Sequence, residues 1–213
     1  MVKLPKSFGL IVPYATWMVL MAALPATASA YAIRTGVVAV MIGWMLRGER
    51  RKLLLGEPHR EYAVSPRSDF RSLSSSLLPG LIMGILVFAI WILPEQFDWV
   101  WYRRWCIVGE GGTQAVAEAS TAMIAVRLIG SAFVISVAEE LFFRKWLIGF
   151  AGFWWMVALF AVEHDRWFVG AVAGSVYGIL YLRRGLLAAI VAHATTNLVL
   201  GFWVLKMSQW QFW

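Results

Sequence analysis

Apolar residues occur along the chain in long runs, and short polar segments separate them. Most runs are close to the length that crosses the hydrocarbon core of a bilayer as an α-helix. The sequence therefore predicts an all-α protein, a polytopic transmembrane helix bundle with about seven spans, within a range of about six to eight. The runs cover residues 8–24, 31–46, 76–93, 119–146, 147–163, 167–182 and 186–204.

One segment, residues 47–75, is strongly polar. Between positions 47 and 71 it holds seven arginines and lysines beside four acidic residues. Because basic residues concentrate in the cytoplasmic loops of membrane proteins, we expect a cytoplasmic loop here and a cytoplasmic N-terminus. This loop either only sets the orientation of the protein in the membrane or also forms a docking site for a substrate or partner.

Composition supports this class of protein. The chain is 61% hydrophobic and 15% charged, whereas a soluble domain carries nearer a quarter of charged residues. The net charge of +7 arises from the polar loop and from helix ends, where it favours contact with the lipid bilayer and not with nucleic acid. A single cysteine, Cys106, excludes an intramolecular disulfide and a cysteine-based zinc site.

The first apolar run has two interpretations. Lysines precede it and small residues follow it up to Ala30, as in a cleaved signal peptide. A second apolar run begins at once at Tyr31, and no soluble body follows it. We therefore predict that the first helix is retained, within one integral membrane domain.

The side chains that could take part in catalysis cluster around an acidic pair, Glu139 and Glu140, in the fourth apolar run. Ionisable groups in hydrocarbon are costly and are rare unless they are paired or functional. On a helix Arg144 faces Glu140 at a spacing of four residues, so Glu139 points elsewhere and is free to act as a general base. The alternative is an ion pair at a helix end. Arg127, earlier in the same run, is either an intramembrane partner or a snorkelling residue.

Two further polar groups lie on apolar runs. His164 follows an aromatic run, and taken alone it is more typical of an interfacial histidine. His193 and Asn197 are four residues apart in the last run, so both side chains emerge on one helix face. At that depth polar residues face a bundle interior or a water-filled cavity. An interhelical hydrogen bond is the simpler alternative.

Together these groups match the parts of a peptidase that activates water. They supply a carboxylate base, a histidine to assist it, and donors for an oxyanion. A divalent metal such as zinc, held by Glu139, His164 and His193, is an alternative. The sequence contains no HExxH motif, and we assign no metal ligand and favour no cofactor.

The pattern Glu139-Glu140-x-x-x-Arg144, Phe160-x-x-x-His164 and His193-x-x-x-Asn197 resembles the signature of the CPBP intramembrane proteases. These include the CAAX prenyl endopeptidases of the Rce1 type and the bacteriocin-processing (ABI) proteins. The resemblance covers roughly residues 119–205, preceded by N-terminal membrane spans over 1–118. A branch related to CAAX proteases and associated with exosortases is also similar in its short length and charged first loop.

The resemblance implies roles for these residues. Glu139 would activate water with the help of His164, while His193 and Asn197 would stabilise the oxyanion and Glu140 and Arg144 would support the site. The expected function is an intramembrane endopeptidase of a bacterial inner (plasma) membrane that cuts a protein or peptide substrate delivered by the membrane. The glutamate mechanism is favoured over a metal-dependent one. The alternative is a non-catalytic membrane scaffold or regulator that keeps the protease fold.

The depth of the three motifs raises a geometric problem. Counted inward from Arg144 and Lys145, Glu139 would lie about 7–9 Å from the cytoplasmic end, and His193 about 13 Å from Arg184. A straight span over 147–163 would carry His164 to the outer face, too far to join them. We therefore predict a re-entrant or interfacial turn within 147–153, near Gly149 and Gly152; the alternative is that the helices tilt and the site lies deeper. The cavity is expected to open to the cytoplasmic leaflet.

Overall fold

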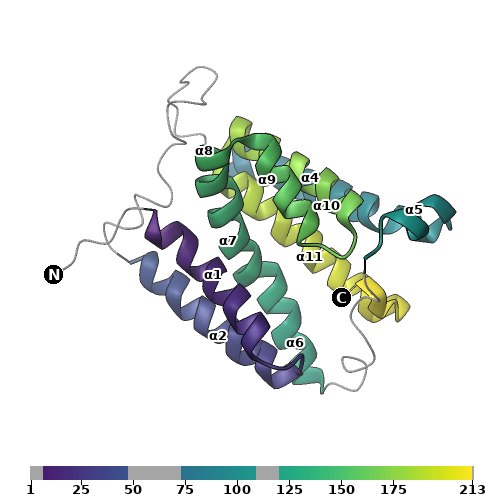
Figure 1. Cartoon of the computed structure of the whole chain (residues 1–213), viewed down its shortest axis with the longest axis horizontal. Helices are drawn as coiled ribbons and strands as arrows, with labels where there is room; N and C mark the ends of the chain where they lie inside the picture. The colour runs from purple at the N-terminus through teal and green to yellow at the C-terminus, as the bar shows by residue number, and fades with distance from the viewer. Residues whose placement is uncertain (1–6, 48–72, 109–119, 213) are drawn as a thin grey trace.

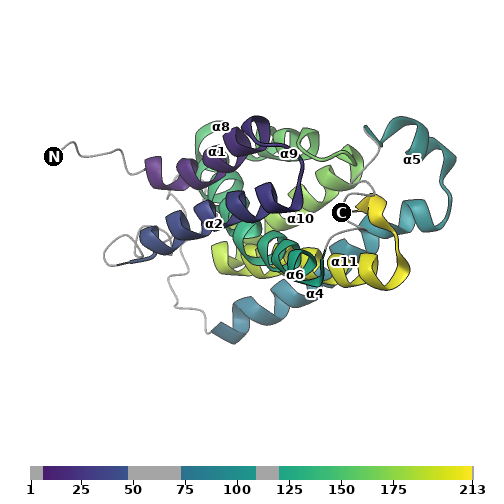
Figure 2. The same ribbon diagram turned by 90° about the horizontal axis from the view of Figure 1, so that it is seen from below.

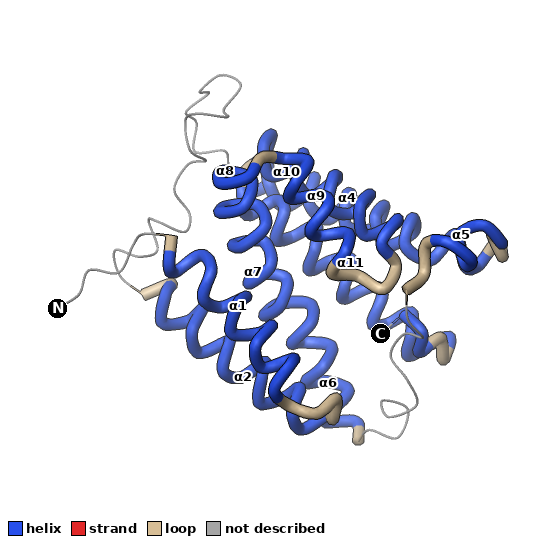
Figure 3. Tube along the Cα trace, in the orientation of Figure 1, coloured by secondary structure: helices blue, strands red, loops and turns tan. Residues whose placement is uncertain are grey.

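The computed structural model describes residues 7–47, 73–108 and 120–212, and the chain is almost entirely helical in these ranges (Figure 1, Figure 3). The predicted all-α membrane helix bundle is confirmed. Five consecutive elements form one continuous helix, which we call the rod, and two of them, η2 and η3, are π-helical. The five are α6 (Thr121–Ile129), η2 (Gly130–Ile135), α7 (Ser136–Glu139), η3 (Glu140–Leu147) and α8 (Ile148–Ala151). The other elements are α1 (Phe8–Ala23), α2 (Ala28–Met45), α4 (Leu73–Gln96), α5 (Val100–Trp105), α9 (Phe153–Val162), α10 (Trp167–Arg184), α11 (Leu186–Met207) and η4 (Trp210–Phe212).

Within the described residues, four helices are long and apolar enough to cross a membrane. Helices α1 and α9 are apolar but shorter, and α10 ends in two arginines. Residues 48–72, which hold nearly all of the polar segment expected in the cytoplasm, lie outside the described ranges. The four helices of span length cover Ala28–Met45, Ser75–Gln96, Thr121–Ala151 and Leu186–Met207.

The rod that carries the acidic pair is longer than the sequence suggested. The fourth run was expected to end at Trp146, but the helix continues to Ala151. The distance along the helix from Glu139 to this end is therefore about 18 Å, which places Glu139 deeper than the 7–9 Å expected. The helix continues because residues 147–151 are apolar, and it stops where Gly152 adopts a φ of 91°, a conformation that favours glycine.

The turn at Gly152 brings His164 back into the bundle. Helix α9 is only 10 residues long, so the chain that follows it lies part of the way along α10. Here His164 Cβ lies 3.3 Å from the Cβ position that a side chain at Gly170 would occupy. The predicted turn near residues 149–152 is thus present in the structure, and it resolves the depth problem.

Helices α4 and α11 pack closely where Gly80 and Gly84 face α11. Gly80 and Gly84 form a small-xxx-small spacing on α4 that the sequence analysis overlooked. A Cβ added at Gly84 would lie 2.5 Å from the carbonyl oxygen of Ala192, and one at Gly80 would lie 2.8 Å from Val191 Cβ. Small residues allow such backbone approach between membrane helices.

Helix α1 contributes to the same core as the motif helices. Its Tyr14 ring stacks on Phe142 at 4.5 Å between centroids, and Tyr14 and Trp17 are buried in the main hydrophobic cluster. Figure 2 shows α1 and α2 beside the rod, with α4 and α11 paired on its other side. Whether the first helix is retained in cells stays a prediction.

We expect Gly84→Ala to lower the unfolding free energy by about 1–3 kcal/mol, because the new methyl group overpacks the α4–α11 contact. Gly43→Ala is the matched control, since nothing lies within 4 Å of a Cβ at that position of α2. Thermal unfolding in detergent, followed by tryptophan fluorescence, measures both. Equal stability of the two variants would contradict the close packing described for α4 and α11.

Candidate functional site

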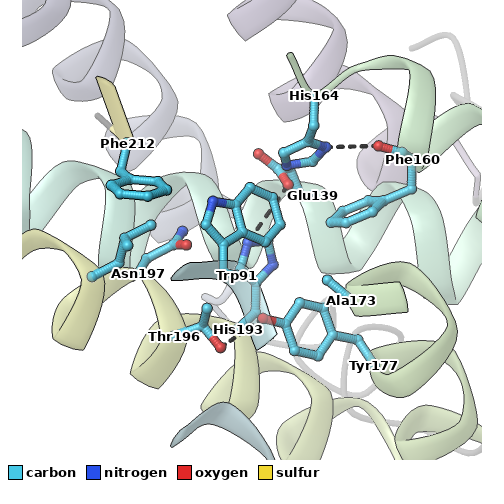
Figure 4. Close-up of a pocket in the computed structure, with 11 residues that line it drawn as sticks. Trp91, Glu139, Phe160, His164, Ala173, Tyr177, His193, Thr196, Asn197 and Phe212 are labelled. Atoms are coloured by element: carbon cyan, nitrogen blue, oxygen red, sulfur yellow. Dashed lines mark hydrogen bonds and ion pairs between the residues drawn. The ribbon is translucent and has the colours of Figure 1, made fainter. Parts of the chain in front are cut away.

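A cavity of about 160 Å³ lies between the rod and helices α4, α9, α10 and α11 (Figure 4). Four of the residues that line it are those predicted to be catalytic: Glu139, His164, His193 and Asn197. They come from the rod, from the loop after α9, and from α11, so only the folded bundle brings them together. The other lining residues are Trp91, Phe160, Ala173, Tyr177, Thr196, Leu200 and Phe212.

Directly below the cavity, Glu140 and Arg144 form an ion pair with no exposed surface on either side chain. Arg144 Nη1 lies 3.0 Å from Glu140 Oε1. The guanidinium also lies 4.2 Å from the centre of the Phe160 ring and 5.3 Å from that of Tyr177. The alternative interpretation, an ion pair at a helix end, is therefore wrong, because the helix continues and the bundle encloses both charges.

The rod departs from α-helical geometry on both sides of Glu139. The π-helical elements η2 and η3 flank the single α-turn α7, and π-helical turns are frequent at functional sites. In η2 the Ser131 carbonyl accepts hydrogen bonds from Ser136 Oγ at 3.0 Å and from Asn197 Nδ2 at 3.1 Å. The irregular backbone thus provides an acceptor that holds a polar residue of α11 against the rod.

His193 contacts both members of the acidic pair. Its Nδ1 lies 2.8 Å from Glu140 Oε1, and its Nε2 lies 3.8 Å from Glu139 Oε2. The ring stacks on Tyr177 with centroids 4.9 Å apart, and the Tyr177 hydroxyl donates to Thr196 Oγ1 at 2.7 Å or accepts from it. Since Glu140 is already paired with Arg144, it acts as an acceptor that fixes the orientation of the imidazole.

His164 presents its other ring nitrogen to the cavity. Nδ1 lies 2.7 Å from the Phe160 carbonyl oxygen. A carbonyl can only accept a hydrogen bond, so Nδ1 carries the proton and Nε2 of the neutral ring has a free lone pair. Burial lowers the pKa of His164 to about 4, which keeps the ring neutral at physiological pH. Both His164 and Glu139 line the cavity (Figure 4).

Asn197 is engaged with the rod through both hydrogens of its amide. Nδ2 donates to the Ser131 carbonyl at 3.1 Å and to Ser136 Oγ at 3.2 Å. The interhelical hydrogen bond considered as an alternative is therefore present. Donation to an oxyanion would require that Asn197 exchange one of these two bonds for the new acceptor.

Sequence analysis missed a third carboxylate beside the cavity. Glu163 lies close to the Tyr14 hydroxyl of α1. Its charge also acts on the Glu139 carboxylate. Only the folded bundle reveals this contact, because Tyr14 lies in a different apolar run. Two aromatic walls of the cavity, Trp91 and Phe212, were missed for the same reason.

Two other expectations concern residues outside this arrangement. Arg127 lies over the Tyr31 ring at 5.3 Å, and the Tyr31 hydroxyl donates to the Arg127 carbonyl at 3.3 Å. Arg127 does not line the cavity.

In the described part of the chain, no group of three or more His, Cys, Asp or Glu side chains is arranged to hold a metal ion. The alternative ligand set of Glu139, His164 and His193 therefore does not form such a group.

Comparison with known proteins identifies the region that carries the three motifs. Residues 121–199 match a family model described as Rce1-like, type II CAAX prenyl endopeptidase. The match covers all the predicted site residues and confirms the resemblance to the CPBP and Rce1-type family. No curated protein and no solved structure matches the chain.

We expect Arg144→Ala to reduce the unfolding free energy by about 3 kcal/mol or more, because it leaves the fully buried Glu140 carboxylate without its counter-ion. Arg184→Ala, at an exposed arginine at the end of α10, is the control and should change stability little. Thermal unfolding of both variants in the same detergent provides the comparison. A stable Arg144→Ala protein would show that the buried pair is not needed for the fold.

Proposed function

Because residues 121–199 match the Rce1-like family of CAAX-type membrane endopeptidases, we propose that this protein hydrolyses a peptide bond in a membrane-associated protein or peptide. Glu139 activates the attacking water, and His164 assists it. His193 and Asn197 stabilise the oxyanion that forms. The single observation that carries the proposal is that these four side chains line one cavity inside an apolar bundle.

The contacts support a division of roles between the two glutamates. Glu140 is held by Arg144 and by His193 Nδ1, and both of these partners favour its ionised form. Glu139 lines the cavity, and its Oε2 lies without a hydrogen-bond partner among the described residues. A carboxylate oxygen with free acceptor capacity is what a general base requires.

The reaction then proceeds by direct attack of water. Glu139 takes one proton from the water, and the oxygen attacks the carbonyl carbon of the scissile bond. His164 Nε2 accepts a hydrogen bond from the same water and orients it. Protonated Glu139 returns its proton to the leaving amine as the carbon–nitrogen bond breaks. No acyl-enzyme forms in this sequence of steps.

Oxyanion stabilisation comes from α11. His193 directs Nε2 toward the oxyanion, while the Glu140 carboxylate holds the opposite nitrogen, Nδ1. Asn197 donates after it exchanges its bond to Ser136 or to Ser131 for the oxyanion. Hydrogen bonds of this kind act strongly in a site from which water is largely excluded.

We expect Glu139→Gln to abolish cleavage while the protein still inserts and folds, because the amide cannot accept the proton of the water. Asp165→Asn is the matched control, since this exposed acid is next to His164 but does not line the cavity. Labelling of new N-termini in membranes from cells that express each form, followed by mass spectrometry, detects the products. Hydrolysis of a fluorescence-quenched farnesylated peptide by purified protein tests the CAAX-type substrate directly.

The competing function, a membrane scaffold without catalysis, makes the opposite prediction. In that case cells with Glu139→Gln would keep the cellular function, and wild type and variant would yield the same set of N-termini. Full cleavage by the Glu139→Gln protein would overturn the proposed mechanism and leave the family unaffected.

A further inference from the structure

The cavity occupies one end of the α4–α11 pair and not the other. In the half near Gly80 and Gly84, the α4 backbone lies close against Ala188 and Ala192 of α11. A Cβ atom added at either glycine would collide with the α11 backbone. Farther along the pair, Trp91 on α4 faces the cavity. Small residues therefore close the first half of this interface, and larger side chains in the second half leave a hollow between the helices.

Lining residues near the closed end are the most deeply buried, although Phe212, near the open end, is also buried. Phe160, Tyr177 and Thr196 are each 1–2% exposed, and the buried Arg144 lies beneath them. His164 and Leu200, at the other end of the cavity, are only partly buried. The closed end thus points toward the Gly80 half of the bundle, and the open end points the opposite way.

Three elements surround the open end. The Arg166 side chain pairs with Glu95 at the end of α4 and lies 4.8 Å from the ring of Phe212. Trp167 Nε1 donates to the carbonyl oxygen of Trp105 in α5 at 2.8 Å. The cavity therefore ends beside α5, η4 and the loop after α9. In Figure 1 these parts lie at the opposite end of the bundle from α8.

The charges of the sequence place these two ends relative to the membrane. In the sequence, the basic stretch 47–71 falls between α2 and α4, and α4 begins on the Gly80 side; Arg183 and Arg184 end α10 directly before α11 begins on that same side. Between α4 and α6, by contrast, the sequence over 97–120 holds two arginines against three acidic residues. The excess of basic residues marks the closed end as cytoplasmic.

We propose that the cavity opens toward the outer leaflet, so that the enzyme cuts substrates at the non-cytoplasmic face of the membrane. The substrate class is then a membrane-anchored protein or peptide whose scissile bond lies in an extracytoplasmic segment next to the bilayer. This inference rests on the proposed peptidase function for its substrate class. It reverses the sequence-based expectation of a cavity open to the cytoplasmic leaflet.

Cysteine labelling in intact spheroplasts tests the direction of the opening. In a Cys106→Ala background, which removes the only native cysteine, Leu200→Cys places a thiol on the cavity wall and Arg184→Cys places one at the closed end. We expect a charged, membrane-impermeant maleimide added outside to label Leu200→Cys in intact spheroplasts. Arg184→Cys should become labelled only after permeabilisation.

The reverse pattern would overturn the inference, and so would a Leu200 thiol that reacts only after permeabilisation or not at all. Repeating the labelling on the Glu139→Gln background separates this result from catalysis. Outside labelling without any cleavage would contradict the peptidase function alone. Cleavage together with labelling from the cytoplasmic side alone would contradict the opening alone.

Discussion

The ion pair between Glu140 and Arg144 is the constraint on which the rest of the arrangement depends. Charged side chains in an apolar bundle are tolerated only when partners compensate them. Here the compensation comes from three directions: the ion pair itself, the aromatic rings around the guanidinium, and His193 on α11. Each partner fixes a different helix against the rod, so the buried charge organises the position of α9, α10 and α11.

The same contacts separate the two glutamates chemically. His193 binds Glu140 through one nitrogen and directs the other toward Glu139 at 3.8 Å. The π-helical segments on both sides of Glu139 change the direction in which neighbouring side chains leave the rod. A structural acid and a cavity-lining acid can thus be adjacent in sequence. Glu140 is held by Arg144 and His193, whereas Glu139 lines the cavity.

Packing of small residues determines where the cavity lies. Gly80 and Gly84 bring α4 against α11 at one end, while Trp91 lines the hollow at the other. The N-terminal region also takes part, because Tyr14 of α1 lies close to Glu163 beside the cavity. The region before residue 121 is therefore part of the site's architecture, although the family model matches only residues 121–199.

The sequence by itself determined the all-α membrane class, the apolar runs and the identity of Glu139, His164, His193 and Asn197 as one candidate set. Hydrophobic run length and helical spacing are local properties, so they can be predicted without the fold. Tertiary structure alone decided the fully buried position of Arg144, the position of Glu163 close to Tyr14, and the place of the cavity between the rod and four other helices. These three features depend on contacts between helices that are distant in the sequence. They also depend on the rod, which continues past its charged residues because the bundle compensates their charge.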